Sequence, residues 1–547
     1  MSNRERISSV DTAWLRMDRP TNLMMIVGVM MFDRPIAFDR LQRVIESRLL
    51  PYRRFRQKAV NDATGSYWED DELFDLEFHL QHTALPSPGG RAELQRYVAE
   101  LISTPLDPAK PLWHFQLVEN YSGGSAMVLR IHHSIGDGIA LMGVMLDLTD
   151  ESPAADGRAP LDAGAGEAEE EAEDEEEFLH QILQPVTDAL ASAAKVSGSV
   201  WSKYREILGN PSQLMDYARI GGTVAAEIAQ LATMPDDSPT RFKGKPGVAK
   251  RVAWSEPLPL TEIKAVGKLL GCSVNDLLLS SVAGALRGYL MEQGDAVDGV
   301  EIRALVPVNL RGPERDPNPN KRLGNRFGLV ALELPVGIEN PMARLYEVKR
   351  RMEELKDSYQ AAVTLGILGL VGMCPKPVQQ QILDLLAAKA TAVMTNVPGP
   401  QKPLYLAGAR LKQMMFWVPQ SGDIGMGVSI LSYDSHVQFG LVADRRFVDN
   451  PEEVVSRFRP EFEKVLYTVL MEPWDRRRSP EEIEAHLAAR SGKDSGAAPP
   501  RSRIRAAGKT AAAGTKGTAA AATKSAGSAR RTAGPPAAKP RVPKRFR

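Results

Sequence analysis

The chain contains the sequence Met127-Val128-Leu129-Arg130-Ile131-His132-His133-Ser134-Ile135-Gly136-Asp137-Gly138. Its first seven residues have the character of a β-strand, on which successive side chains point to opposite faces. His132 and His133 should therefore face different surroundings. The two glycines around the aspartate predict a tight turn, and the apolar residues 139–148 predict a buried helix after it. A strand, a turn and a helix in this order indicate a mixed α/β fold.

A histidine at the end of a strand, facing a loop, is well placed for acid–base chemistry. Its ordinary pKa of about 6.5 leaves His133 mostly neutral at pH 7 and able to accept a proton. An alcohol has a pKa close to that of water, about 15.7. Forming a free alkoxide would then cost roughly 12 kcal/mol, at about 1.36 kcal/mol per pKa unit. A base acting on an alcohol must therefore remove the proton while the oxygen attacks.

The same chemistry needs a donor for the developing oxyanion and a site that excludes water. Two adjacent histidines that point in opposite directions argue against a shared metal ion, and we expect neither a metal site nor a cofactor. Taken alone, the histidine pair fits a structural histidine followed by a turn aspartate at least as well as it fits a catalytic base.

Hydrophobic periodicity on both sides of this segment predicts further strands and helices. The expected strands are residues 24–32, 251–254, 301–308 and 437–441. The expected helices are residues 38–49, 261–270, 276–291 and 451–467, with a long, mostly helical stretch at 178–233.

The length and the distribution of charge predict the domain organisation. A chain of 547 residues is too long for one hydrophobic core, which predicts two folded domains. Residues 151–177 carry 12 acidic and 1 basic residue, whereas residues 491–547 carry 1 acidic and 14 basic residues. Neither composition can bury enough apolar surface to fold. The predicted parts are an N-terminal domain at 1–150, an acidic disordered linker at 151–178, a helical connector at 179–245, a C-terminal domain at 246–480 and a basic disordered tail at 481–547.

Targeting signals are sparse in this sequence. The two cysteines, Cys272 and Cys374, are too few for a disulfide framework or a zinc cluster. No apolar run reaches the roughly 18–20 residues needed to cross a bilayer, and none of signal-peptide length follows Met1. Residues 361–375 are favoured as a buried helix, with contact to a lipid surface as the alternative. We expect a cytoplasmic protein that is not secreted, with peripheral contact to the inner membrane face or to lipid droplets left open.

Residues 132–138 match the His-His-x-x-x-Asp-Gly motif of the acyltransferase superfamily that includes chloramphenicol acetyltransferase, carnitine acyltransferases and peptide-synthetase condensation domains. Six other segments occur in the same order as in bacterial wax ester synthase/diacylglycerol acyltransferases, which the chain resembles over about residues 5–475. These segments are Ser-Ser-Val-Asp-Thr-Ala-Trp at 8–14, Pro-Leu-Trp at 111–113, Asn-Asp at 275–276, Leu-Gly-Asn at 323–325, Asn-Val-Pro-Gly-Pro at 396–400 and Phe-Gly-Leu-Val-Ala-Asp at 439–444.

This resemblance implies two chloramphenicol-acetyltransferase-like α/β domains, with mixed sheets flanked by helices and a tunnel between the domains. In that tunnel acyl-CoA, the co-substrate, would meet an alcohol. The resemblance makes His133 the general base of a direct acyl transfer without an acyl-enzyme. It favours a structural role for Asp137, which would orient the turn with its carboxylate facing away from the substrate.

The resemblance also suggests substrate contacts at several other positions. Asn275 is a candidate to stabilise the oxyanion or to shape the tunnel, although either it or Ser273 could simply cap the following helix. Trp113 is expected to form a tunnel wall. Residues 396–400 are favoured as a structural loop at the domain interface. The remaining candidate contacts are His132, Gly138, Asp276 and Asn396.

These features favour the synthesis of triacylglycerol from diacylglycerol, and of wax esters from long-chain alcohols. Two alternatives are an acyltransferase that uses a carrier-protein thioester and a catalytically silent lipid-binding protein of the same fold. The basic tail is favoured as a solvated segment. If it binds a polyanion, anionic lipid is favoured over nucleic acid, because no aromatic or groove-reading motif accompanies the charge.

Overall fold

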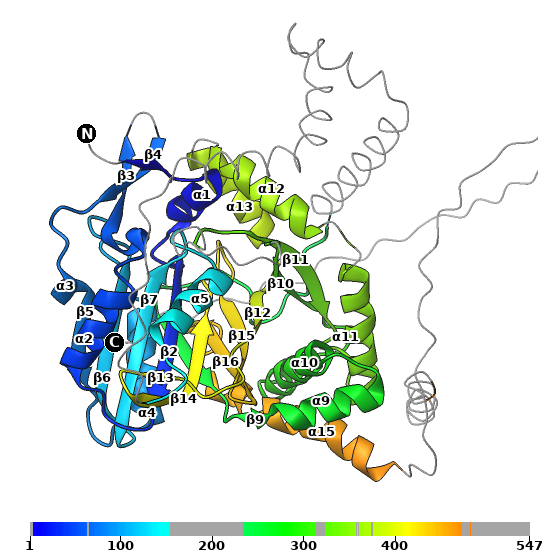
Figure 1. Cartoon of the computed structure of the whole chain (residues 1–547). Coiled ribbons are helices and arrows are strands. Elements are labelled where there is room, and N and C mark those ends of the chain that lie inside the picture. The colour runs from blue at the N-terminus through cyan, green and yellow to red at the C-terminus, as the bar shows by residue number, and fades with distance from the viewer. Residues whose placement is uncertain are drawn as a thin grey trace, which may run out of the picture. The chain divides into compact units, whose positions relative to one another are not determined.

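A computed structural model describes residues 4–62, 65–153, 234–311, 323–356, 358, 360–373, 376–472 and 482. Two large sheets form the frame of this part of the chain, with helices on their faces (Figure 1). The first sheet has six strands, in the order β13 (Tyr405–Leu406), β14 (Ala409–Trp417), β2 (Met25–Phe32), β7 (Gly124–His132), β6 (Trp113–Tyr121) and β5 (Leu80–Ala84).

The second sheet has seven strands and is built from residues after position 249. Its order is β11 (Phe327–Leu334), β10 (Ile302–Asn309), β12 (Ala392–Pro398), β15 (Met426–Tyr433), β16 (His436–Asp444) and β8 (Lys250–Trp254), with β9 (Leu258–Pro259) also paired to β16. A small third sheet contains β1 (Glu5–Arg6), β4 (Gly65–Asp70) and β3 (Gln57–Asp62).

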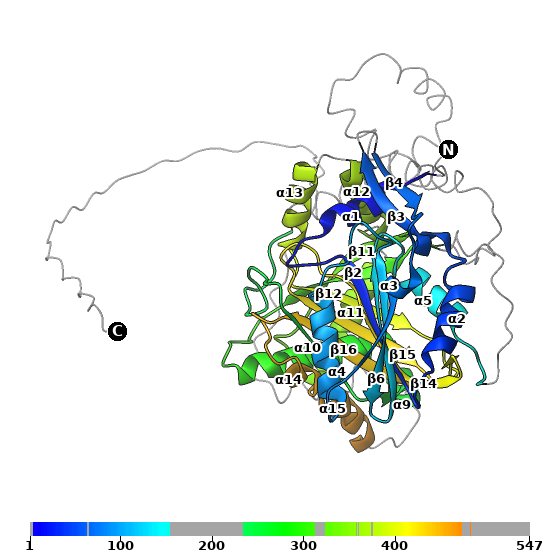
Figure 2. The same cartoon turned by 90° about the vertical axis from the view of Figure 1, so that its left-hand side faces the viewer.

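Helices bury the apolar faces of both large sheets. On the first sheet, α2 (Phe38–Arg48) and α5 (Gly138–Leu148) cover one face and α4 (Arg91–Ile102) covers the other (Figure 2). The core of the second sheet is closed by α9 (Leu260–Leu270), α10 (Val274–Glu292), α11 (Pro341–Lys356), α14 (Glu452–Val455) and α15 (Phe458–Met471). The other helical segments are α1 (Ser9–Met17), the 3-10 helix η1 (Arg53–Arg56), α3 (Leu76–His79), α12 (Gln360–Met373) and α13 (Lys376–Ala387).

The chain crosses between the two large sheets after β12. It leaves the second sheet there, adds β13 and β14 to the first sheet, and returns as β15 beside β12. β14 runs antiparallel to β2, with Leu411 opposite Phe32 and Trp417 opposite Val27. All described residues accordingly lie in one compact unit, Met1–Ser495. The domain limits given above remain a prediction, and the first sheet takes one of its long strands from within 246–480.

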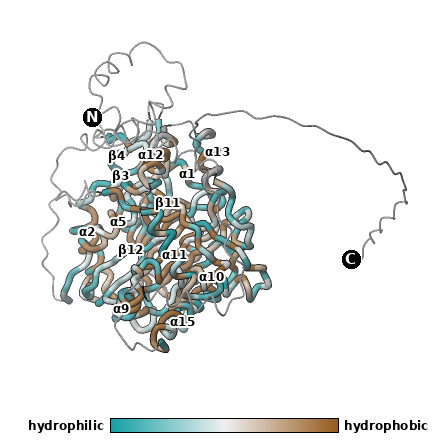
Figure 3. Tube along the Cα trace, turned by 90° about the vertical axis from the view of Figure 1, so that its right-hand side faces the viewer, coloured by the Kyte–Doolittle hydropathy of each residue, from teal (hydrophilic) through white to brown (hydrophobic). Residues whose placement is uncertain are grey.

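α12 packs closely against two elements near the catalytic motif. It lies beside α1 and next to β11 (Figure 3). Glycine permits both approaches, because a Cβ on Gly372 would lie 1.8 Å from the carbonyl oxygen of Ser9, and one on Gly328 would lie 1.7 Å from that of Ala361. Either distance is far below van der Waals contact. Any side chain at Gly328 or Gly372 would therefore push α12 away from its neighbours.

The mixed α/β fold class is confirmed, and the expected strands and helices occur within a few residues of their predicted ends. One expected helix, 451–467, is instead two helices, α14 and α15. Pro460 explains the break, since it has no N–H to donate to the carbonyl of Ser456, and Arg457 N bonds instead to the Val454 oxygen in a tighter turn. The helix expected at 178–233, nearly all of the acidic linker and nearly all of the basic tail lie outside the described residues.

Among the described residues, no single helix has both the length and the apolar composition required to cross a membrane. α9 and α10 pass that test only when taken together, and they are bent by 102° at their junction.

Candidate active site

The two histidines at the end of β7 have different partners, as strand alternation predicts. His132 Nδ1 accepts a hydrogen bond from the Ser134 amide at 3.1 Å, which places the ring proton on Nε2. That nitrogen lies 3.5 Å from a carboxylate oxygen of Asp18. His132 is thus held inside the protein by its own turn and by the end of α1.

His133 lies between two aromatic rings. Its imidazole stacks on Trp14 with ring centroids 4.2 Å apart and planes 15° from parallel, and the Phe327 ring lies 5.5 Å away. The side chain is 3% exposed, and Nδ1 has no hydrogen-bond partner among the described residues. Burial lowers the pKa of His133 to about 4, although Asp137 opposes the shift. The ring is therefore neutral at pH 7 and able to accept a proton.

Asp137 is bonded through both carboxylate oxygens. Oδ1 accepts from the amides of Ile139 and Ala140 at 3.1 and 3.0 Å and so caps α5. Oδ2 accepts from the Arg326 amide at 3.1 Å and pairs with the guanidinium of Arg311. Arg311 follows β10 and Arg326 directly precedes β11, so this carboxylate joins the turn after β7 to the other half of the chain.

The Leu-Gly-Asn segment at 323–325 lies along the turn that follows His133. Gly324 has a φ of +85°, a conformation that favours glycine, and its carbonyl accepts from Asp137 N at 3.2 Å. The Asn325 amide nitrogen donates to the His133 carbonyl at 2.7 Å and to Asp11 Oδ1 at 2.6 Å. Two motifs that are far apart in sequence thus form one hydrogen-bonded unit.

α1 contributes two side chains to this unit. Asp11 and Trp14 are three residues apart and so share one face of the helix. Asp11 bonds to Asn325, while Trp14 stacks on His133. Burial raises the pKa of Asp11 to about 6, against the opposing effect of the Asn325 hydrogen bond. Asn325 therefore connects a carboxyl group with a pKa of about 6 to the backbone carbonyl of His133.

Asn275 and Asn396 lie side by side, with the Asn396 amide donating to Asn275 Oδ1. The cap of α10 is Ser273, whose hydroxyl accepts from Asp276 N at 3.2 Å while Asp276 Oδ2 accepts from Ser273 N at 2.8 Å. Capping therefore accounts for Ser273 and Asp276 and leaves the Asn275 amide available. A role for Asn275 and Asn396 in substrate contact stays a proposal.

Trp113 lies within the core of the first sheet. Its indole nitrogen donates to the Phe55 carbonyl at 2.7 Å, and its ring stacks on His79 with centroids 4.6 Å apart. Trp113 lines neither of the two pockets described next. These contacts hold the indole among side chains of its own half, and a role for Trp113 as a tunnel wall stays a prediction.

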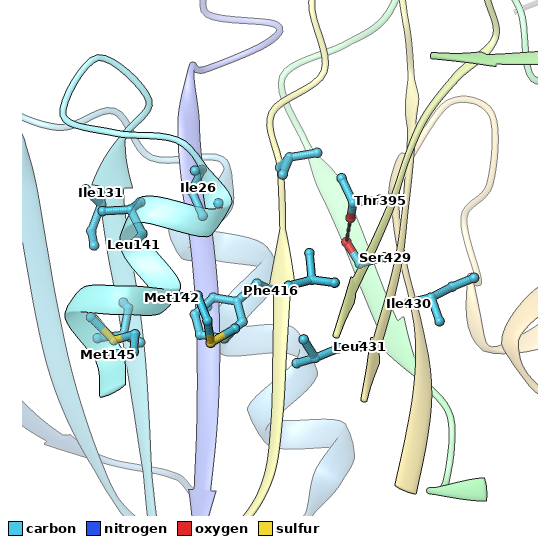
Figure 4. A pocket seen from close by; sticks show the side chains of 15 residues that line it. Ile26, Ile131, Leu141, Met142, Met145, Thr395, Phe416, Ser429, Ile430 and Leu431 are labelled. Atoms are coloured by element: carbon cyan, nitrogen blue, oxygen red, sulfur yellow. Dashed lines mark hydrogen bonds between the residues drawn. The ribbon is translucent and has the colours of Figure 1, made fainter. Parts of the chain in front are cut away.

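Two apolar pockets adjoin the catalytic turn. The α5 pocket is lined by β2, β7, β14 and α5 on one side and by β12 and β15 on the other (Figure 4). Gly138 lines it, and a Cβ at Gly138 would meet no atom within 4 Å. The α12 pocket is lined mainly by β11, α12 and α13, together with Trp14. The motif at 132–138 thus borders the first pocket, and the two rings that pack against His133 border the second.

Family models match most of the described chain. Residues 7–278 match the wax ester synthase/diacylglycerol acyltransferase catalytic domain, and residues 323–465 match the C-terminal domain of the same family. The chain belongs to this family. It is therefore an acyltransferase of the wax ester synthase/diacylglycerol acyltransferase type, and the resemblance noted from its sequence is confirmed.

Known relatives of this wax ester synthase/diacylglycerol acyltransferase family member are distant. The O-acyltransferase WSD of Acinetobacter baylyi is 24% identical over 470 residues, which cover 83% of this chain and 95% of the relative. A probable diacylglycerol O-acyltransferase of Mycobacterium tuberculosis is 27% identical over 415 residues, or 73% of this chain and 82% of the relative.

Solved structures share the fold. The wax ester synthase/diacylglycerol acyltransferase from Marinobacter aquaeolei VT8 matches with a TM-score of 0.59 at 22% identity, covering 85% of this chain and 100% of that one. The first condensation domain of the calcium-dependent antibiotic synthetase matches with a TM-score of 0.55 at 16% identity, covering 88% of this chain and 99% of that one.

Sequence reasoning missed five residues around His133 in this family member. Asp11, Trp14 and Asn325 lie in segments that were recognised as family motifs, and the three-residue spacing of the first two could have placed them on one helix face. Arg311 and Phe327 carry no local signal, because only the tertiary fold brings them to the turn. In the part of the chain that the structure describes, no group of three or more His, Cys, Asp or Glu side chains could hold a metal ion.

Asp11 should give the folded enzyme a measurable pH dependence. The folded protein keeps the Asp11 proton up to about pH 6, whereas an unfolded chain releases it near the ordinary pKa of 3.8. The folded state therefore binds more protons between these values, and stability is lost as the pH rises through that window. Between pH 4 and pH 7, we expect the free energy of unfolding of the wild type to fall by about 2–3 kcal/mol more than that of Asp11→Asn.

Urea unfolding of the wild type and of Asp11→Asn, followed across that pH range, measures the effect. The exposed aspartate variant Asp39→Asn serves as a control for simple removal of charge. If the wild-type and Asp11→Asn curves of unfolding free energy against pH run parallel, the raised pKa of Asp11 is wrong.

Proposed function

We propose that this chain transfers a fatty acyl group from acyl-CoA to the hydroxyl of diacylglycerol, with long-chain alcohols as a second acceptor. One observation carries the proposal: a neutral, buried imidazole packs between two aromatic rings that line one apolar pocket, and the turn after the imidazole reaches a second apolar pocket. The name of the Mycobacterium tuberculosis relative supports diacylglycerol as an acceptor, and the name of the matching family supports both acceptors.

His133 would act as the base on the acceptor alcohol. It accepts the hydroxyl proton as that oxygen attacks the thioester carbonyl, a C–O bond forms, the C–S bond breaks, and the imidazolium returns the proton to the CoA thiolate. The pKa of His133 is about 4, roughly 12 units below the value of about 15.7 for an alcohol. Complete proton transfer before attack would then cost roughly 16 kcal/mol. Proton transfer and attack must therefore proceed together.

The apolar walls of the two pockets suit this reaction in two ways. Hydrocarbon surfaces favour long acyl and alkyl chains, at about 0.8 kcal/mol for each buried CH₂ group. They also keep water away from the thioester, which protects it from hydrolysis. Because the acceptor and the product are lipids, we place their exchange with the enzyme at a lipid surface.

A substrate screen with the full-length protein tests the proposal. Palmitoyl-CoA is supplied with diacylglycerol or hexadecanol, and in a parallel arm a palmitoyl carrier-protein thioester replaces the CoA donor. We expect triacylglycerol as the main product, with one CoA released for each ester formed. Ester formation from the carrier-protein thioester alone would overturn the choice of donor. Lipid binding without any ester formation would overturn the proposed function and indicate a silent lipid-binding protein.

A further inference from the structure

The α5 pocket contains one polar spot. Of the side chains that line it, only those of Thr395 on β12 and Ser429 on β15 carry oxygen, and the rest are hydrocarbon, aromatic or thioether (Figure 4). The two residues are register partners in the second sheet and are 4% and 2% exposed. Two buried hydroxyls therefore face an otherwise apolar space.

The two hydroxyls of this pair bond to each other. Thr395 Oγ1 lies 3.2 Å from Ser429 Oγ and 3.5 Å from the Val428 carbonyl oxygen. Either hydroxyl can be the donor within the pair, because its proton rotates about the C–O bond. When Thr395 donates to Ser429 Oγ, the Ser429 proton is free to turn toward an acceptor in the pocket. A ligand carbonyl there would accept that hydrogen bond.

Thr395 and Ser429 lie in the same pocket as the last residue of the His-His-x-x-x-Asp-Gly motif. Thr395 and Val397 both line the pocket, so β12 presents alternate residues to it, and the intervening Asn396 faces away toward Asn275. Gly138, the last residue of the catalytic motif, lines the same pocket and leaves open space there. A lipid in this pocket would thus extend from the catalytic turn past the hydroxyl pair.

Diacylglycerol and long-chain alcohols differ in the oxygen atoms that they could place beside Thr395 and Ser429. A diacylglycerol carries ester carbonyls, which only accept hydrogen bonds, besides the hydroxyl that reacts. A long-chain alcohol has one oxygen, which must lie at His133, and offers only hydrocarbon to the rest of the pocket. Building on the proposed function, we propose that Thr395 and Ser429 bind an ester carbonyl of the acceptor and so select glycerolipids over simple long-chain alcohols.

A pair of matched acceptors tests the proposal directly. In 1,2-dialkylglycerol the ester groups of 1,2-diacylglycerol are replaced by ethers, so the shape and the reactive hydroxyl stay while the carbonyls are lost. With palmitoyl-CoA as donor, we expect the wild type to prefer the diacyl acceptor by five- to tenfold in kcat/KM. Ser429→Ala and Thr395→Val should abolish that preference by lowering the rate with the diacyl acceptor more than the rates with the dialkyl acceptor and with hexadecanol.

Met142→Leu is the control, because it changes the same pocket without altering its polarity, and it should keep the diacyl preference. An equal fall in rate with every acceptor would overturn the proposal, since the pair would then act on the thioester that all the reactions share. An unchanged diacyl preference in both hydroxyl variants would also overturn it. If the wild type forms no ester with any of the three acceptors, the proposed function itself fails, which is a separate result.

Discussion

Replacing His133 by alanine should lower kcat/KM for ester formation by about 10²–10⁴-fold, the usual contribution of a positioned general base. The imidazole is neutral at pH 7 because burial holds its pKa near 4, so the proposed base is in its proton-accepting form in nearly every enzyme molecule. Its removal leaves the acceptor hydroxyl without a proton acceptor at the catalytic turn. Steady-state release of CoA with diacylglycerol, at matched concentrations of folded protein, measures the loss.

Alanine also removes a ring from the stack with Trp14 and Phe327, so a second variant must separate chemistry from packing. His133→Phe keeps an aromatic ring between them but has no basic nitrogen. We expect it to unfold in urea close to the wild-type midpoint while losing as much activity as the alanine variant. If His133→Phe retained more than a tenth of wild-type kcat/KM, His133 would not be the base.

The acidic limb of the wild-type pH profile gives an independent check. A free-enzyme pKa of about 4 predicts that kcat/KM stays level down to about pH 5, as long as the protein remains folded. A histidine with its ordinary pKa would instead lose activity near pH 6.5.

The lowered pKa of His133 also affects stability. Between pH 4 and pH 6.5 the folded state binds fewer protons than the unfolded chain. The contribution of His133 to the free energy of unfolding therefore falls as the pH drops from about 6.5 to about 4.

Local sequence patterns predicted the strand, the turn and the helix of this site, because each is determined by residues that are close together in the sequence. Alternation along β7 separates the two histidines, Gly136 and Gly138 flank the turn, and Asp137 caps α5 through the amides that follow it. Each of these features depends on residues within a few positions of one another. The strand, the turn, the helix and the proposed base could therefore be placed before any tertiary structure was known.

The surroundings of the site were not predictable in the same way, because they depend on which segments meet. No strand was predicted at 409–417, and nothing in that stretch indicates that it joins β2 instead of its neighbours in sequence. Likewise, the aromatic character of Trp113 does not reveal on which side of β6 the indole packs, and it lies in the core. The contacts of Phe327 and Arg311 with the catalytic turn arise only when the two halves pack.

Asp137→Ala should be the most destabilising change at the catalytic turn. It removes the cap of α5, which is worth about 1 kcal/mol, and it leaves the guanidinium of Arg311 without its carboxylate. Loss of one partner from a buried ion pair costs about 3–5 kcal/mol. Arg311 is 18% exposed, which favours the lower end of that range. We expect a total loss of about 4 kcal/mol in the free energy of unfolding, measured by urea denaturation, with a large fall in activity.

Asp137→Asn and Arg311→Met show how the carboxylate acts. Asparagine keeps one oxygen for the cap but can turn its NH₂ group toward the Arg311 guanidinium and the Arg326 amide, both of which are donors. If Asp137 is a positioning residue, Asp137→Asn and Arg311→Met should lose stability and activity together, and combining them should cost less than the sum of the two. If Asp137 relayed protons, Asp137→Asn would instead abolish kcat at nearly unchanged stability, and Arg311→Met would keep most of the activity. The four hydrogen bonds to this carboxylate leave little capacity for a relay, so we expect the first pattern.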